Sequence, residues 1–171
     1  MDEALAKRLQ LLEDRAQIEE LRATYCFLVD DGRFDELVDE WFTEDAVCDF
    51  HAVRGGTLAL LAQGRPEVRT FFAQLVAGTL QDMCHTKHNH RIVVDGDDAA
   101  GDCYFELTAK DAASAAAIVG AGRYVDRYRR VDGRWRFAQH NAEIFYMAPL
   151  AEGWVVRPFL DVPLPTAKTS T

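Results

Sequence analysis

Long apolar runs are missing from this chain, although 49% of its 171 residues are hydrophobic. A helix that crosses a bilayer needs about 20 consecutive apolar residues, and no stretch approaches that length. The N-terminal residues MDEALAKRLQ form a charged helical pattern without the apolar block of a secretory signal. These absences predict a soluble, cytoplasmic protein with no membrane partner.

Positive charge is scarce as well. The chain carries 19 Lys and Arg residues against 28 Asp and Glu residues, which gives a formal net charge of −9. Such a protein repels a phosphate backbone, and its basic residues are scattered apart from a cluster at Arg127, Arg129 and Arg130. Nucleic acid is therefore not an expected partner.

Cysteine is also sparse, and no two cysteines form a C-x-x-C pair. The wide spacing excludes a small disulfide-dense framework. We expect reduced, mostly buried thiols at the four positions Cys26, Cys48, Cys84 and Cys103.

Helical periodicity fills much of the first half of the chain. Apolar residues recur every three or four positions from Ala4 to Val29, with a break expected near Glu13-Asp14, and Asp30-Asp31-Gly32 ends the pattern. A shorter helix is predicted over 34–42, and a third begins at Pro66 and ends before Gly78. Between them, residues 46–53 and 57–61 alternate as strands do.

The second half is typical of long antiparallel strands. Four strand-like runs are predicted at Cys84–Val94, Ala100–Lys110, Ala115–Arg130 and Trp135–Met147, with a turn sequence around Gly96 between the first two and another around Gly133 between the last two. Helices followed by strands predict an α+β fold in which a curved sheet wraps around the helices. We expect one domain over 1–171, with its core at about 8–148 and a tail at 149–171 that covers the mouth of a pocket.

The first candidate site residues are Asp30 and His85. An aspartate at the C-terminal end of a helix is electrostatically unfavourable, which favours a protonatable partner such as a histidine. His85 opens a strand, so alternation places it on one face with Lys87 and Asn89, while His88 and His90 take the other. In the opposite interpretation His88 and His90 point inward, and a β-bulge would mix the two sets.

Two other kinds of chemistry compete for this segment. The spacing of His85, His88 and His90 resembles a metal site, with His51 and His140 as distant ligands, but no motif positions a Glu or fourth ligand. Cys84 adjoins His85, yet adjacent strand residues face opposite sides, so a thiol–imidazole pair is not expected. We predict neither a metal nor a cofactor.

Tyrosines supply the remaining candidates. Tyr25 is either a core aromatic or a hydrogen-bond donor to a substrate oxygen. Tyr104 and Tyr124 are candidates for lining the pocket, although an aromatic on a strand is commonly a packing residue.

Three segments carry a family resemblance. They are IEELRATYCFLVDDGRFDELVDEWFTEDAV, HTKHNHRIVVDGDDA and RYVDRYRRVDGRWRFAQHNAEIFY, which together run from Ile18 to Tyr146. In these segments the chain resembles SnoaL-like proteins of the nuclear transport factor 2-like superfamily. By motif it is most similar to the group that contains scytalone dehydratase, hexachlorocyclohexane dehydrochlorinase and bile-acid dehydratase.

The resemblance implies a cone-shaped α+β barrel and a cofactor-free lyase. In that group an aspartate at the end of the first helix pairs with a histidine on a central strand, and Asp30 and His85 occupy the matching places. Tyr25 matches a tyrosine of bile-acid dehydratase. His140 stands where the dehydrochlorinase carries a pocket arginine, so the resemblance does not identify the group that leaves the substrate.

The predicted function is therefore a lyase, most simply a dehydratase, acting on a small hydrophobic or aromatic, cyclic substrate. An isomerase or polyketide-type cyclase needs the same proton abstraction, and a non-catalytic ligand-binding domain is the third possibility. Asp30, His85 and Tyr25 are the predicted catalytic residues. The predicted substrate-binding residues are Asn89, His88, His140, Tyr124 and Tyr104. A curved sheet with a free outer face also predicts a homo-oligomer.

Overall fold

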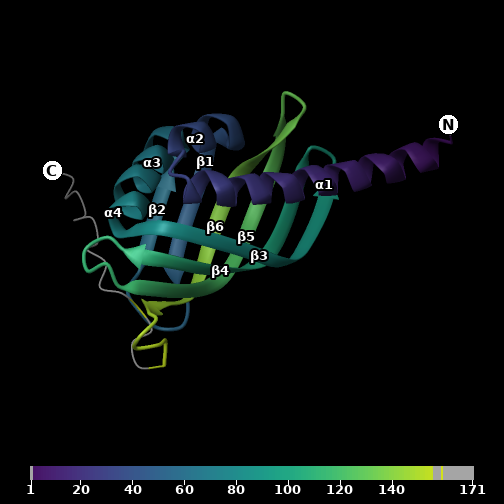
Figure 1. Cartoon of the computed structure of the whole chain (residues 1–171). Coiled ribbons are helices and arrows are strands. Elements are labelled where there is room, and N and C mark those ends of the chain that lie inside the picture. The colour runs from purple at the N-terminus through teal and green to yellow at the C-terminus, as the bar shows by residue number, and fades with distance from the viewer. Residues whose placement is uncertain (1, 156–158, 160–171) are drawn as a thin grey trace.

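The computed structural model describes residues 2–155 and residue 159. It begins with the long helix α1, Glu3–Asp30, whose first turn is capped by the Asp2 carboxylate. The helix lies across the sheet and its N-terminal turns extend beyond it (Figure 1). The break expected near Asp14 does not occur, because the buried Asp14 carboxylate accepts a hydrogen bond from the Trp135 indole and pairs with Arg130 at 2.8 Å.

Short elements connect α1 to the main sheet. Helix α2, Phe34–Trp41, passes directly into strand β1, Phe42–Ala52, and strand β2 follows at Ala59–Gln63. The predicted third helix is a continuous run of α3, Gly64–Thr70, a π-helical segment η1, Phe71–Val76, and α4, Ala77–Thr79. Wide π turns inside helices are frequent at functional sites, and this one lies beside the cavity described below.

The four long strands match the predicted runs closely. They are β3 at Leu80–Asp95, β4 at Asp98–Asp111, β5 at Ala117–Val131 and β6 at Arg134–Pro149. The described sheet has the order β2-β1-β6-β5-β4-β3, and its neighbours are antiparallel except for the parallel pair β1–β6. This confirms the predicted α+β class with a curved mixed sheet around the helices (Figure 1).

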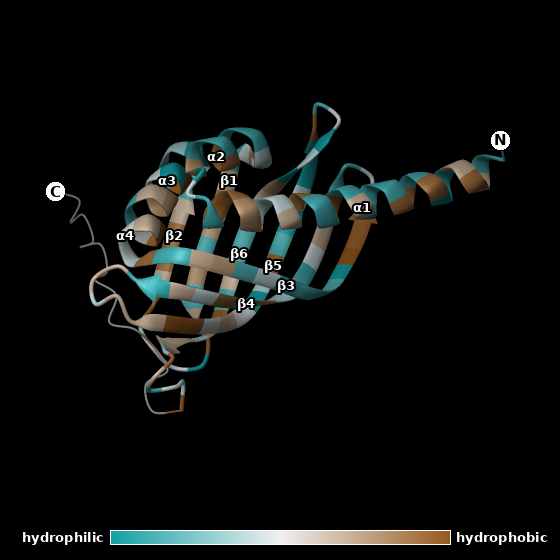
Figure 2. Ribbon diagram, viewed as in Figure 1, coloured by the Kyte–Doolittle hydropathy of each residue, from teal (hydrophilic) through white to brown (hydrophobic). Residues whose placement is uncertain are grey.

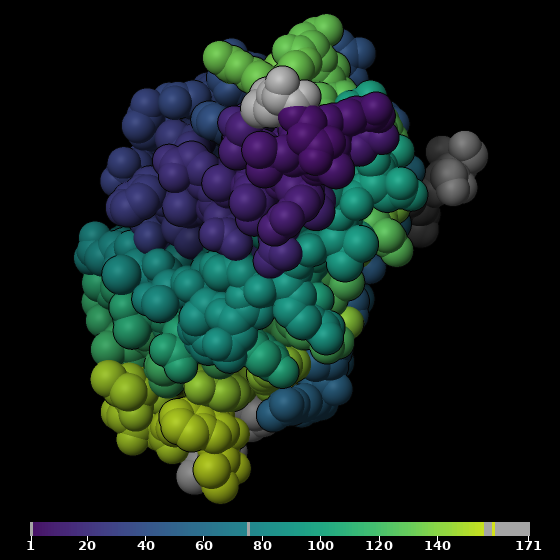
Figure 3. All heavy atoms as spheres, turned by 90° about the vertical axis from the view of Figure 1, so that its right-hand side faces the viewer, coloured from purple at the N-terminus to yellow at the C-terminus, as the bar shows by residue number. Residues whose placement is uncertain are grey.

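The core fills the space between the sheet and the helices. Hydrophobic and hydrophilic residues alternate along the strands (Figure 2), and about every second residue of β4, β5 and β6 is buried. Tyr25, Phe72 and Phe137 meet edge to face in this core, with ring centroids about 6 Å apart. In the space-filling view, α1 lies directly against β3 (Figure 3).

Two expectations concern the membrane and the C-terminal tail. None of the helices in the described part of the chain combines the length and hydrophobicity of a membrane span.

Most of the tail predicted to cover the pocket mouth lies outside the described residues. Phe159, which is described, forms a β-bridge with Met147 and packs against the core.

Candidate active site

Asp30 and His85 are in direct contact. Asp30 is the last residue of α1, and its Oδ1 lies 2.5 Å from His85 Nδ1 on β3. Its second oxygen accepts a hydrogen bond from the backbone N–H of His85 at 2.9 Å. Because a carboxylate only accepts, His85 Nδ1 carries the proton and Nε2 keeps a free lone pair. The Asp30 side chain is 17% exposed and the His85 side chain 7% exposed, so the pair is largely shielded from water.

Strand register explains why His85 points inward. His85 pairs with Leu107 and Lys87 pairs with Phe105, and both partners on β4 are buried. Directly opposite residues of antiparallel strands share a face, so His85 and Lys87 face the helices.

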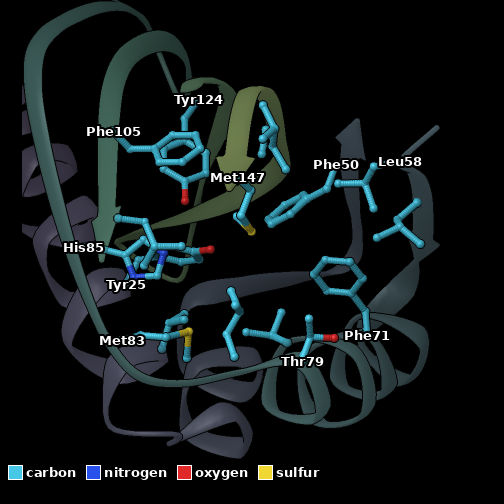
Figure 4. A pocket seen from close by; sticks show the side chains of 17 residues that line it. Tyr25, Phe50, Leu58, Phe71, Thr79, Met83, His85, Phe105, Tyr124 and Met147 are labelled. Carbon is cyan, nitrogen blue, oxygen red and sulfur yellow. The ribbon is translucent and has the colours of Figure 1, made fainter. Parts of the chain in front are cut away.

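A cavity opens beside the Asp30–His85 pair, with an empty volume of about 660 Å³ that includes the space open to solvent at its mouth. Its walls are aromatic and aliphatic, and its polar side chains are those of His85, Tyr25, Tyr124 and Thr79. Figure 4 shows Tyr25 and His85 together at one end of the cavity, with the Tyr124 hydroxyl directed toward that end. The apolar wall comprises Val29, Phe50, Leu58, Leu60, Phe71, Val76, Leu80, Met83, Phe105, Leu107, Ala142, Ile144 and Met147.

Tyr25 and Tyr124 form the polar end of the cavity together with His85. Their rings meet edge to face with centroids 5.9 Å apart, and burial raises the pKa of both phenols well above the usual value. Both therefore stay protonated and can donate hydrogen bonds. The Tyr25 ring meets the His85 ring edge to face, with ring centroids 6.4 Å apart.

Behind the two tyrosines lies a second, fully buried Asp–His pair. Asp126 accepts hydrogen bonds from His140 Nδ1 at 2.9 Å and from the Tyr128 hydroxyl at 2.7 Å, and Arg22 donates to that hydroxyl at 2.5 Å. Burial lowers the pKa of His140 by more than Asp126 raises it. Burial also acts to raise the pKa of Asp126, but His140 and the nearby cations outweigh it and hold that pKa below its usual value.

The structure separates the five residues predicted to bind substrate. Tyr124 lines the cavity. His140 lies one layer deeper, its ring 4.7 Å from that of Tyr124. It is not among the residues described as lining the cavity.

His88, Asn89 and Tyr104 lie away from the cavity, contrary to the prediction. A register shift between His88 and Arg91 inserts one extra residue, and Asn89 takes the positive φ of 58° that this bulge requires. Asn89 is exposed, and His88 lies beside Tyr104, which is 42% exposed. After the bulge His90 turns inward, where its Nδ1 accepts a hydrogen bond from Arg22.

The histidines of the metal alternative have different partners in the structure. Among the described residues, no group of three or more His, Cys, Asp or Glu side chains is close enough to hold an ion. His85 is engaged by Asp30 and His90 by Arg22, and they lie in different hydrogen-bonded groups.

Sequence reasoning missed the buried charges Arg22 and Asp126, and it placed Lys87 on the face of His85 without assigning it a role. One signal was available for Asp126. It lies two residues from both Tyr124 and Tyr128, so all three side chains take the same face of β5. For Arg22, the helical face shared with Ile18, Leu21 and Tyr25 was the corresponding signal.

The chain resembles known proteins in both sequence and fold. Residues 10–141 match the model of the SnoaL-like domain. An uncharacterized protein of Mycobacterium tuberculosis H37Rv is 34% identical over 90 residues, which are 52% of this chain and 56% of that protein, so the match spans about half of the relative.

Two solved structures are similar over most of their length. The crystal structure of LinA has a TM-score of 0.72 at 25% identity and covers 84% of this chain and 94% of that one. The hexachlorocyclohexane dehydrochlorinase LinA-type3 of Novosphingobium barchaimii LL02 has a TM-score of 0.70 with the same identity and coverage.

Proposed function

The chain belongs to the SnoaL-like domain family, and on that premise we propose that it is a cofactor-independent lyase of the dehydratase kind. The observation that carries the proposal is the 2.5 Å contact between Asp30 and His85 Nδ1, which leaves the other ring nitrogen free at the polar end of an apolar cavity. Structural neighbours that include a dehydrochlorinase support small-molecule elimination chemistry.

His85 is the proposed base. Its Nε2 takes a proton from a substrate carbon next to a carbonyl group, and Asp30 stabilises the imidazolium that forms. Both oxygens of Asp30 are bound by His85, so the ring is held in one tautomer and one orientation. This arrangement prepares the base before the substrate enters.

Tyr25 and Tyr124 are the proposed donors to the carbonyl oxygen. When the C–H bond breaks, its electron pair delocalises onto that oxygen as an enolate, and a hydroxyl donor stabilises the charge. The surrounding apolar wall lowers the local dielectric constant, so the hydrogen bond stabilises the charge more than it would in water.

Elimination completes the reaction. The electron pair returns from the enolate to form a C=C bond, the neighbouring C–O bond breaks, and the His85 imidazolium gives its proton to the departing hydroxide. The products are an unsaturated carbonyl compound and water, and no redox partner is needed. The apolar wall suits a small hydrophobic, cyclic substrate.

A substrate screen followed by mutagenesis tests the proposal. Hydroxylated and halogenated cyclic ketones are incubated with the protein, and products are identified by mass spectrometry. On a substrate found in this way, His85→Ala should nearly abolish turnover. Tyr25→Phe should raise the activation free energy by about 2–4 kcal/mol at most. His88→Ala is the matched control, because it removes an imidazole from the outer face of the same strand. Wild-type kcat/KM in folded His85→Ala would exclude this histidine as the base.

The same pair of residues also suits an isomerase or cyclase. In that case the proton taken by His85 returns to a different carbon, or the enolate attacks a carbonyl carbon within the substrate, and no group leaves. Product mass distinguishes these outcomes, since dehydration removes one water and isomerisation removes nothing. A ligand that binds and is recovered unchanged would favour a non-catalytic binding domain.

A further inference from the structure

Lys87 carries a buried ammonium group directly beneath the polar end of the cavity. Its Nζ lies 4.0 Å from the centre of the Tyr25 ring and 4.4 Å from the centre of the Tyr124 ring. Although the residue as a whole keeps some exposure, Nζ itself is buried and has no hydrogen-bond partner among the described residues. The ammonium therefore makes cation–π contacts with two aromatic rings.

Lys87 forms no direct ion pair with any of the described residues. Asp126 is the buried carboxylate of this region, and Arg22, whose Nε lies 3.9 Å from it, already offsets its charge. Burial lowers the pKa of His140, whose Nδ1 is hydrogen-bonded to Asp126. Burial also lowers the pKa of Lys87, while Asp126 acts in the opposite direction. A charged Lys87 is therefore a buried cation without a direct ion pair, and its burial costs stability unless an anion compensates for it.

We propose that Lys87 is a positioning residue whose buried ammonium makes the Tyr25–Tyr124 hydroxyl pair an oxyanion-binding site. The inference deepens the proposed function and rests on it for the identity of the anion. The ligand class it defines is an apolar molecule with one oxygen that becomes negative at the hydroxyl pair, as the carbonyl oxygen of a ketone does when an enolate forms.

The physical link runs through the tyrosine rings. A hydroxyl that donates to an anionic oxygen shares its proton more fully, so negative charge builds up on the ring. The attraction between that ring and an ammonium about 4 Å from its centre grows accordingly, and the low dielectric of the interior leaves it weakly screened. A neutral ligand oxygen draws less of the hydroxyl proton, so it strengthens the attraction between the ring and the ammonium much less.

Phenols of graded acidity provide a test that needs no turnover. 4-Methylphenol, 4-chlorophenol and 4-nitrophenol have one ring and one oxygen, and their affinities are measured by calorimetry below their solution pKa values. Lys87→Met removes the charge and keeps the length of the side chain. Lys110→Met is the matched control, because it removes a partly exposed lysine charge that pairs with Asp82 at the surface.

In the wild type, affinity should rise with phenol acidity, and bound 4-nitrophenol should show the visible absorption of the phenolate, its proton having passed to His85 Nε2. In Lys87→Met the affinity for 4-nitrophenol should fall about tenfold or more, which corresponds to ~1.4 kcal/mol or more, and the phenolate band should weaken. The affinity for 4-methylphenol should change little, and Lys110→Met should behave as wild type.

Stability separates this role from a purely structural one. Because the ammonium is buried without a direct ion pair, Lys87→Met should melt at or above the wild-type temperature while its preference for acidic phenols is lost. Should Lys87→Met fail to fold, Lys87→Gln takes its place. An unchanged dependence on acidity in a folded variant, or no binding of any phenol to the wild type, would overturn the proposal. Absence of lyase turnover with normal phenol binding would instead count against the proposed function alone.

Discussion

Replacing Asp30 by asparagine changes one atom in the contact that fixes the His85 ring. Asp30 accepts two hydrogen bonds from His85, one from Nδ1–H and one from the backbone N–H. An asparagine side chain can accept only one of them, because its NH₂ group is a donor. The amide oxygen then faces either the backbone N–H or the ring, and the two cases have different consequences.

If the amide oxygen takes the backbone N–H, its NH₂ group faces His85 Nδ1, which must become the acceptor. The ring proton then moves to Nε2 and removes the lone pair that abstracts the substrate proton. If the amide oxygen faces the ring, two donors oppose each other at a cost of about 1–3 kcal/mol. Loss of the correct tautomer lowers kcat of His-based enzymes by about 10⁴, which corresponds to ~5.5 kcal/mol, and we expect about 10³–10⁴ for Asp30→Asn.

Two measurements check this expectation. The first is kcat on a substrate found by the screen, with KM expected to change little because the cavity wall is intact. The second is ¹⁵N NMR of the His85 imidazole, which distinguishes Nδ1–H from Nε2–H without any substrate. Asp31→Asn is the matched control, since Asp31 is the exposed neighbour at the end of α1. An Asp30→Asn protein with wild-type kcat and an unchanged tautomer would refute the reasoning.

The remaining predictions concern stability, metals and assembly. Gly122→Ala should lower the free energy of unfolding by about 1–3 kcal/mol in urea titrations, because a Cβ there would lie 2.5 Å from both the Glu143 carbonyl oxygen and the Phe105 ring; an unchanged midpoint would contradict it. Burial lowers the pKa of His140, so below the ordinary histidine pKa the unfolded chain binds a proton that the folded chain excludes. The melting temperature should therefore fall as the pH drops from about 7 to 5, and less steeply in His140→Gln; equal slopes would argue against this source. Prolonged chelation should change neither melting temperature nor activity, and a metal that co-purifies stoichiometrically would count against this. Light scattering should show a homo-oligomer rather than a monomer.

Much of the fold could be predicted because each element has a clear period. The strands after Leu80 alternate over 14 to 16 residues, and the turns at Gly96 and Gly133 require the positive φ that both glycines adopt. The boundaries were less accurate. Strand β1 begins directly after Trp41, because Phe42 is fully buried and its backbone is already extended.

The inner face of β3 could be predicted only as far as its bulge. Strict alternation correctly places His85 and Lys87 together, and fails from Asn89 onward because one extra residue reverses the alternation. An asparagine tolerates a positive φ better than most residues, but a single Asn within a strand pattern does not predict where a bulge lies. The interior position of His90 therefore could not be predicted without knowing how β3 pairs with β4.

The buried polar group behind the tyrosines depends on tertiary structure in the same way. Arg22, Lys87, Asp126 and His140 come from α1, β3, β5 and β6, and each alone resembles a surface residue in a sequence of this composition. Burial of one such group is unfavourable, so the chain pattern argues against it. Burial becomes possible because the sheet brings Asp126 within reach of His140 and of the Tyr128–Arg22 hydrogen bond. Lys87 lacks such a hydrogen-bond partner among the described side chains, so its position beneath the cavity calls for a functional account that the other three do not need.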